Sequence, residues 1–199
     1  WTRGPWDPRA QHGGPPAALM LRAMEIAAPD AQLARLTVEF LRSIPIARCD
    51  LELEPTRTGR RALGFACTLR ADGRACARAH GLFLRDAPLA VPPGLPPVPA
   101  PRDPLAHPAY EFEFFGDRDG YHKAMELRRP PQPEEPGRGA IWLRLRGRLV
   151  DGEDPSPAQR VVVAADAING VGFALDLARF SFPNADLSVH LHRLPESEW

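Results

Sequence analysis

The sequence predicts an α+β protein built from two similar units, each with one helix packed against antiparallel strands. The main observation is an internal repeat: residues 36–42 and residues 187–193 both read L-[ST]-V-x-[FL]-x-R, at an offset of 151 positions. A proline follows each copy, and each copy comes after an apolar, alanine-rich helical stretch, which we expect at the same distance. Repetition of a whole helix-plus-strand unit indicates a duplicated fold. Ligands tend to bind in the groove between such halves.

Composition sets the outer limits on function. The chain of 199 residues has 44% hydrophobic content, enough to bury a sizeable core. Its net charge is zero with acids and bases interspersed, so we expect neither a nucleic-acid nor a membrane partner. The three cysteines are odd in number and form no C-x-x-C motif, which disfavours a disulfide framework or a zinc site and favours a cytoplasmic location.

The first predicted unit covers residues 1–86 and begins with a helix from Gly13 to Ala28. Pro15 and Pro16 suit a first helical turn, where the missing N–H has no partner to lose. Apolar residues then recur at three-and-four spacing, which gives the helix one apolar stripe. Four strands are expected after it, over residues 33–44, 50–56, 61–70 and 74–84.

A proline-rich stretch over residues 87–108 predicts an extended, stiff connector. The second unit, residues 109–199, is expected to hold strands over 109–115, 121–128 and 140–150, with a mobile loop over 129–138. A helix starts at Ser156 and Pro157 and runs towards Phe173, and the repeat strand follows it. About three strands of the first unit have no counterpart after it, so we expect a second unit that is incomplete at its C-terminus.

Four segments together carry a family resemblance. They are residues 6–16 (WDPRAQHGGPP), residues 36–45, residues 165–170 (ADAING) and residues 187–195, with Trp199 after them. In this combination the chain resembles the double hot-dog acyl-CoA thioesterases, the TesB-like group. The resemblance implies two helices, each wrapped by an antiparallel sheet, with the two sheets joined into one surface. It also implies an acyl-CoA substrate, no cofactor, no metal, and a homo-oligomer that is a dimer or larger.

The turn at His12, Gly13 and Gly14 is a candidate site for polarising a thioester carbonyl. Its backbone lies at a helix start, where free N–H groups and the positive end of the helix dipole can face a developing negative oxygen. The alternative is that the glycines only permit a tight turn before the helix.

Asp166 is the candidate general base. Subtracting the repeat offset places it opposite Pro15, directly after Ala164 and Ala165, and only the second helix carries an acid at that position. One active site is therefore expected. Apolar neighbours on both sides predict burial, which would raise the pKa of Asp166 and suit it to base chemistry. The alternative is an acid on the solvent side of the helix, or one that caps a turn.

In TesB-like enzymes an aspartate on the second helix, a threonine before the following strand and a more distant glutamine hold the attacking water. The resemblance assigns Asp166 to the aspartate, while Asn184 stands where the family has threonine. The glutamine would lie beyond Trp199. Asn169, one helical turn after Asp166, is expected to share its face and to orient the carboxylate or the substrate, unless it is a structural amide.

Arg57 and Arg60, around the turn at Thr58 and Gly59, are candidates for binding the phosphates of CoA through charge and paired hydrogen bonds. Arginines that are simply solvated at a turn are the commoner alternative.

The predicted function is hydrolysis of an acyl-CoA thioester by direct attack of water, assisted by an aspartate base. Two alternatives stay open: a hot-dog hydratase or dehydratase of acyl thioesters, and a non-catalytic acyl-CoA or lipid-binding protein. Release of free thiol from a panel of acyl-CoAs separates the three. A hydratase would change enoyl absorbance without releasing thiol, and a binding protein would do neither.

Overall fold

The computed structural model describes residues 2–88, 90, 94, 103–112, 119–132, 137–172, 174–176 and 179–199. The first unit holds one helix and four strands: α1 (Gly14–Ala27), β1 (Gln32–Phe40), β2 (Asp50–Thr58), β3 (Ala62–Ala71) and β4 (Arg74–Leu84). The second unit holds shorter elements: η1 (Pro104–Ala106), β5 (Ala109–Tyr110), α2 (Tyr121–Ala124), β6 (Met125–Arg128), β7 (Trp142–Leu145), α3 (Pro157–Ala165), η3 (Ile168–Gly170) and β8 (Asp186–His190).

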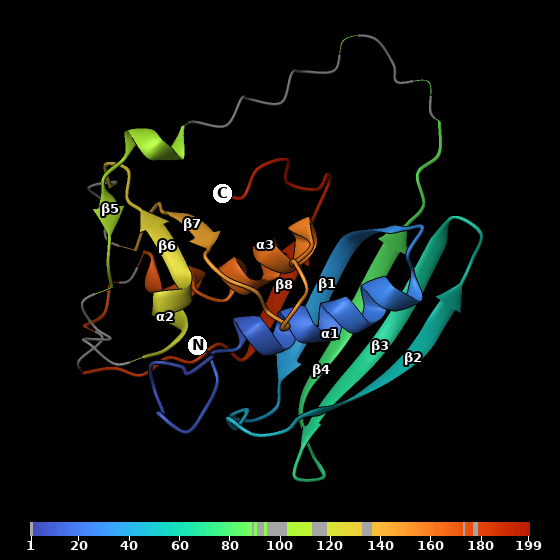
Figure 1. Cartoon of the computed structure of the whole chain (residues 1–199), viewed down its shortest axis with the longest axis horizontal. Coiled ribbons are helices and arrows are strands. Elements are labelled where there is room, and N and C mark those ends of the chain that lie inside the picture. The colour runs from blue at the N-terminus through green and yellow to red at the C-terminus, as the bar shows by residue number, and fades with distance from the viewer. Residues whose placement is uncertain are drawn as a thin grey trace.

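The larger sheet joins the two units. Its strand order is β2-β3-β4-β1-β8, so the last strand of the second unit pairs with the first strand of the first unit (Figure 1). Thr37 lies opposite Ser188, which is its own counterpart at the repeat offset of 151. On either side Leu36 lies opposite Val189, and Val38 opposite Leu187. The register is therefore symmetric about the Thr37–Ser188 pair, as expected for two copies of one strand related by a local two-fold axis.

The hydrophobic core lies between this sheet and α1, which crosses one face of the sheet (Figure 1). The apolar stripe of α1 is fully buried at Met20, Leu21 and Met24. Leu36 and Val38 of β1, two residues apart, are buried from the sheet side because alternate side chains of a strand point to the same face. The predicted helix and four strands of the first unit are thus present, with ends that differ by a few residues.

The two helices pack antiparallel. At one end Gly14 of α1 approaches α3 so closely that an added Cβ would lie 2.5 Å from the carbonyl oxygen of Val163. At the other end Ser156 Oγ and Gln159 Nε2 donate hydrogen bonds to the carboxylate of Glu25. The start of α1 therefore meets the end of α3, and this contact positions the site described below.

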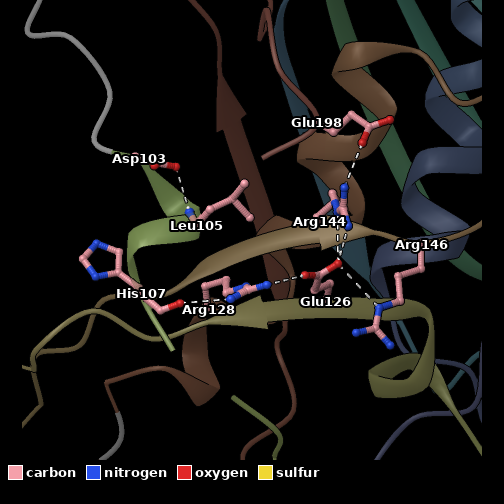
Figure 2. Close-up of polar contacts among 8 residues, drawn as sticks. All are labelled: Asp103, Leu105, His107, Glu126, Arg128, Arg144, Arg146 and Glu198. Carbon is pink, nitrogen blue, oxygen red and sulfur yellow. Dashed lines mark hydrogen bonds and ion pairs between the residues drawn. The ribbon is translucent and has the colours of Figure 1, made fainter. Parts of the chain in front are cut away.

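A small sheet, with strand order β5-β6-β7, carries a cluster of charges (Figure 2). The carboxylate of Glu126 on β6 accepts hydrogen bonds from Arg128 and Arg144, and Arg146 lies 3.8 Å away. The hydrogen bond from Arg144 holds the pKa of Glu126 below its ordinary value. Arg144 also pairs with Glu198 at 3.2 Å, which ties the C-terminal segment to β7.

Three predicted strands of the second unit differ from the structure. The strand expected over 109–115 is limited to residues 109–110, since residues 111 and 112 are not in a strand and residues 113–115 lie outside the described part. Residues 121–124 form the single helical turn α2, and only residues 125–128 are a strand. Tyr121 and Met125 are both buried, and a spacing of four fits a helical turn as well as it fits an alternating strand. The strand expected over 140–150 is limited to residues 142–145.

The second helix is shorter than predicted. It ends at Ala165 rather than running towards Phe173, which lies outside the described residues. Four residues separate α1 from β1, whereas twenty residues, 166–185, separate α3 from β8. The expectation that both repeat strands follow their helices at the same distance is therefore wrong. The repeat offset holds for the strands but not for the helices.

Other predicted features fall partly outside the described residues, namely much of the connector over 87–108, the end of the strand over 109–115, and part of the loop over 129–138. In the part of the chain that is described, no helix combines the length and the apolar character that crossing a bilayer requires.

Candidate active site

A cavity of about 530 Å³ lies where the two units meet. Six separate parts of the chain form its wall: the N-terminal segment, the end of β1, the segment after β5, the start of α2, the turn after α3, and the segment before β8. The lining residues used below are His12, Gly13, Phe40, Arg42, Ile44, Phe112, Tyr121, Asp166, Asn169, Phe182 and Asn184, together with Trp6.

Asp166 provides the buried charge of this cavity. It is the C-cap residue of α3, it is 5% exposed, and it lies beside the first turn of α1. Its Oδ2 lies 2.8 Å from His12 Nδ1, and its Oδ1 accepts a hydrogen bond of 2.8 Å from Asn184 Nδ2. Asn184 Nδ2 also donates to the backbone carbonyl of Asp166, at 2.9 Å. Because a carboxylate only accepts hydrogen bonds, His12 Nδ1 carries the proton in the contact with Oδ2.

The start of α1 supplies a third donor. The Gly14 N–H lies 3.3 Å from His12 Nδ1, but a protonated nitrogen cannot accept a hydrogen bond, so the acceptor of this N–H is the carboxylate of Asp166. Burial raises the pKa of Asp166, whereas the hydrogen bonds from His12, Asn184 and Gly14 lower it. The lowering wins, and the pKa of Asp166 lies below its ordinary value. The predicted burial is present, but the predicted rise in pKa is wrong, because burial comes with three donors.

One N–H group at the start of α1 has no hydrogen-bond acceptor among the described residues. Pro15 and Pro16 have no N–H, and the Ala17 N–H already donates to the Gly13 carbonyl at 3.0 Å. Among the described residues the Gly13 N–H donates to no acceptor, and Gly13 lines the cavity. A Cβ on Gly13 would lie 2.6 Å from the ring of Phe40 and 2.8 Å from Asp166 Oδ2, so any larger residue here would have to displace these side chains. The site therefore presents an unused donor at the positive end of a helix.

Tyr121 completes the surroundings of His12. The two rings are stacked, with centroids 3.7 Å apart and an interplanar angle of 7°. The Tyr121 hydroxyl donates a hydrogen bond of 2.8 Å to the carbonyl of Val163 on α3. Burial and the nearby charge of Asp166 raise the pKa of Tyr121, so its hydroxyl stays protonated. Sequence reasoning placed Tyr121 on a strand and missed this contact, for which no local motif gives a signal.

Asn169 is not placed as the sequence predicted. The helix stops at Ala165, so Asn169 lies in η3 and does not share a helical face with Asp166. Its Nδ2 donates to the backbone carbonyl of Phe182 at 3.1 Å. Asn169 still lines the cavity, whereas orientation of the carboxylate falls to Asn184.

Arg57 and Arg60 lie at the opposite end of the sheet. Arg57 pairs opposite Gly64 near the end of β2, and Arg60 lies in the turn that follows. The antiparallel ladder places this end beside the start of β1, whereas the cavity lies beside its end, at Phe40. The structure thus does not bring these two arginines to the site. Arg42, which was not predicted, lines the cavity instead.

The groups that contact the Asp166 carboxylate are nitrogen donors of His12, Asn184 and Gly14, and no second carboxylate is among these contacts. Within the described ranges, no three side chains of His, Cys, Asp or Glu gather closely enough to hold a metal ion. The cavity thus combines a buried carboxylate that could accept a proton, a backbone N–H that could bind a negative oxygen, and an apolar wall that could bind an apolar group.

Comparison with known proteins identifies the family. The sequence pattern of the acyl-CoA thioesterase N-terminal domain matches residues 2–84, and that of the acyl-CoA thioesterase C-terminal domain matches residues 92–199. No curated protein matches the chain.

Solved structures show the same fold. A hot-dog protein of unknown function from Alicyclobacillus acidocaldarius has a TM-score of 0.67 at 21% identity, over 97% of this chain and 72% of its own. A tesB protein from Mycobacterium avium subs paratuberculosis has a TM-score of 0.62 at 20% identity, over 93% of this chain and 69% of its own. The acyl-CoA thioesterase II TesB2 from Mycobacterium marinum has a TM-score of 0.51 at 21% identity, over 76% of this chain and 56% of its own. These similarities confirm the predicted double hot-dog fold. The chain belongs to the acyl-CoA thioesterase family, and it is a thioesterase enzyme.

Proposed function

We propose that this thioesterase hydrolyses acyl-CoA by direct attack of a water molecule that Asp166 orients and deprotonates. The proposal rests above all on one observation: the buried carboxylate of Asp166 lines the cavity and is fixed by donors from both units. A carboxylate with a lowered pKa is ionised at neutral pH, which a base requires before it can accept a proton.

The carboxylate has room for a water molecule in its hydrogen-bonding capacity. Each of its oxygens has two lone-pair directions. His12 uses one on Oδ2, Asn184 uses one on Oδ1, and the Gly14 N–H uses a third, so one of the four stays open. A water that donates to Asp166 from the cavity side would be held in place before the substrate arrives. Asn184 takes the place that the family gives to threonine, and its amide keeps the carboxylate oriented.

The Gly13 N–H is proposed to bind the thioester carbonyl. The oxygen of that carbonyl becomes negative as water adds, and backbone donors at a helix start stabilise such a charge without reorganising. The glycine also keeps the approach open, because it has no side chain between the carbonyl and the N–H.

The proposed hydrolysis needs no covalent enzyme intermediate. The water oxygen forms a bond to the acyl carbon, its proton passes to Asp166, and the carbon–sulfur bond breaks to release the thiolate of CoA. A thiol with a pKa near that of cysteine, about 8.5, leaves without help from an acid. The proton on Asp166 then returns to solvent, and the products are a carboxylate and CoA.

The acyl group is proposed to occupy the apolar part of the cavity. The aromatic and large apolar residues of that wall are Phe40 at the end of β1, Ile44 after it, Phe112 and Phe182 from the second unit, and Trp6 from the N-terminal segment. Trp6 and Phe182 are in ring contact, with centroids 5.4 Å apart, so the two units close over the same part of the cavity.

Free-thiol release from acyl-CoAs of increasing chain length tests the proposal. Asp166→Asn keeps the shape of the side chain and removes the base, so we expect kcat to fall by about 10²-fold or more with KM nearly unchanged. Asp151→Asn, at an exposed turn, is the matched control and should retain wild-type activity.

Three outcomes would overturn the proposal. An Asp166→Asn protein with the wild-type rate would move the base elsewhere. A wild-type protein that changes enoyl absorbance without releasing thiol would be a hydratase. A protein that binds acyl-CoA and does neither would be a binding protein.

A homo-oligomer is also proposed. The polar outer face of the larger sheet has Arg35 and Glu39 on β1, with His190 and Asp186 beside them on β8. Arg35 lies opposite His190 and Glu39 opposite Asp186, so the basic and the acidic residues form two separate groups. When two copies pair face to face about a two-fold axis, the basic group of one can lie against the acidic group of the other. Sedimentation should give a dimer or a larger species at micromolar concentration, and a monomer would contradict this.

A reducing, cytoplasmic location is proposed from the cysteines. Cys49, Cys67 and Cys76 are free, and Cys67 is buried, with its pKa raised by burial to about 11. A buried thiol with a raised pKa is mostly protonated and reacts slowly. Three free cysteines with no disulfide are typical of a reducing compartment. Localisation of a tagged protein in its own cells tests this, and export would contradict it.

A further inference from the structure

Tyr121 is a buried titratable residue that the hydrolysis proposed above does not use. It is 2% exposed and belongs to α2, a helix of a single turn. Its backbone N–H donates to the carbonyl of Arg3 at 3.0 Å, and its hydroxyl donates to the carbonyl of Val163 at 2.8 Å. The N-terminal segment and α3 therefore fix the two ends of this side chain.

The ring of Tyr121 lies flat on the imidazole of His12. The centroid distance of 3.7 Å and the interplanar angle of 7° leave no space between the two faces. A rotation of the imidazole out of this plane would drive its edge into the phenol ring, which cannot retreat because it is buried among close-packed side chains of the core. The retained orientation is the one in which His12 Nδ1 lies 2.8 Å from Asp166 Oδ2.

We propose that Tyr121 is a positioning residue, whose ring holds the His12 imidazole in the orientation that donates a hydrogen bond to Asp166. This rests on the proposed function, because it assigns Tyr121 an effect on the base of that reaction. The hydroxyl has a separate part, which is to anchor the ring to α3.

Few charged groups face Asp166. His12 approaches from the N-terminal segment, Tyr121 lies behind it on α2, and Asn184 from the segment before β8 is neutral. Without the hydrogen bond from His12, the effect of burial would be opposed more weakly, and the pKa of Asp166 would rise. The acid limb of the pH profile would then move to higher pH, since the base must be ionised to work.

The test compares two substitutions at one position. Tyr121→Leu removes the ring, and we expect kcat to fall about tenfold, with little change in KM and an acid limb of kcat/KM that lies about one pH unit higher. Tyr121→Phe keeps the ring and loses only the hydroxyl, so it should retain the wild-type acid limb and kcat within about threefold. Unfolding midpoints of both variants show whether each is folded at the assay temperature.

A double-mutant cycle separates positioning from general support of the fold. In a His12→Ala background, Tyr121→Leu should change kcat by less than about twofold, because the group through which it acts is gone. Equal losses in both backgrounds would overturn the proposal, as would a Tyr121→Phe protein as impaired as Tyr121→Leu. Where Tyr121→Leu does not fold, Tyr121→Phe alone still tests the proposal, because an acid limb that moves to higher pH although the ring is kept would overturn it.

Failure of this inference differs from failure of the proposed function. If Asp166→Asn is active at the wild-type rate, the hydrolysis mechanism fails. If Asp166→Asn is inactive and Tyr121→Leu is additive with His12→Ala, only the role of Tyr121 fails.

Discussion

The two units agree in their repeat strands and differ in what connects each helix to its strand. β1 and β8 correspond at a constant offset and pair symmetrically about Thr37 and Ser188. In the first unit only residues 28–31 join helix to strand, whereas residues 166–185 do so in the second. The strands preserve the two-fold relation, and the connections break it.

We infer that this difference limits the proposed site to one copy in the described part of the chain. The longer connection carries Asp166 at its start and Asn184 near its end, with Asn169 and Phe182 between them, and all four line the cavity. The short connection of the first unit has no residues with which to build a second copy. The symmetric pair of strands joins the two units, and the asymmetric segment 166–185 carries residues of the proposed site.

The helix ends show the same division. Asp166 lies at the C-terminal end of its own helix, where a negative charge is unfavourable, and beside the start of α1, where it is favourable. The antiparallel packing of α1 and α3 thus gives the first unit an acceptor for its helix start, because Gly13 has no side chain with which to cap it.

The largest expected effect follows from breaking the contact between the units. Gly14→Val places a side chain where an added Cβ would lie 2.5 Å from the Val163 carbonyl oxygen. We expect the free energy of unfolding to fall by about 3 kcal/mol, measured by urea denaturation, and thiol release to be almost abolished. Gly147→Val is the control, since nothing lies within 4 Å of its added Cβ, and it should be nearly neutral. Equal stability of the two variants would contradict the close contact.

A smaller effect separates the two asparagines of the asymmetric segment. Asn184→Ala removes a donor to the Asp166 carboxylate, so kcat should fall about tenfold. Asn169→Ala removes only the hydrogen bond to the Phe182 carbonyl, and kcat should fall by less than about threefold. The thiol-release assay compares them directly. A larger loss in Asn169→Ala would reverse the roles that the geometry suggests.

The pH dependence of stability tests the charge between the units. A carboxyl group whose pKa is lowered in the folded protein stabilises it above the unfolded value and loses that contribution as the pH falls through the folded value. The free energy of unfolding of the wild type, relative to Asp166→Asn, should therefore be constant from pH 7 to about pH 5 and decline below about pH 4. Chemical denaturation at each pH measures the difference. A difference that grows on acidification would mean a raised pKa.

The smallest effect is expected on the two-fold axis itself. The Oγ atoms of Thr37 and Ser188 are 3.5 Å apart on the exposed face of the sheet, which is a weak contact. Thr37→Val should change the free energy of unfolding by less than about 0.5 kcal/mol, because the backbone ladder carries the pairing. A loss several times larger in thermal or chemical unfolding would assign the pairing to these side chains.

Much of the fold could be predicted from local pattern. Residues 74–84 are a strand as predicted, since alternating burial and the preceding turn agree there. Asp72 and Gly73 in that turn both have positive φ, which suits the residue types present. The pattern over residues 121–124 does not distinguish a helix from a strand, because one turn of helix and a short strand both bury Tyr121 and Met125.

The site could be predicted only in part. His12, Gly13, Gly14, Asp166 and Asn184 lie together in the structure, although the repeat offset that placed Asp166 opposite Pro15 does not hold for the helices. The pKa of Asp166 depends on three donors that are distant in sequence. The stack of Tyr121 on His12 depends on packing between elements, which no spacing along the chain reveals. The unit boundaries at 1–86 and 109–199 stay predictions.

A single turnover in water enriched with oxygen-18 tests the central claim most directly, namely that Asp166 acts on water at one site made by both units. With enzyme in excess over acyl-CoA, direct attack puts one heavy oxygen into the carboxylate product and leaves the peptide that contains Asp166 unlabelled. We expect mass spectrometry to find the heavy oxygen in the carboxylate product and none in that peptide. An unlabelled product, with the heavy oxygen in Asp166, would show that the carboxylate attacks the thioester itself and would contradict the account.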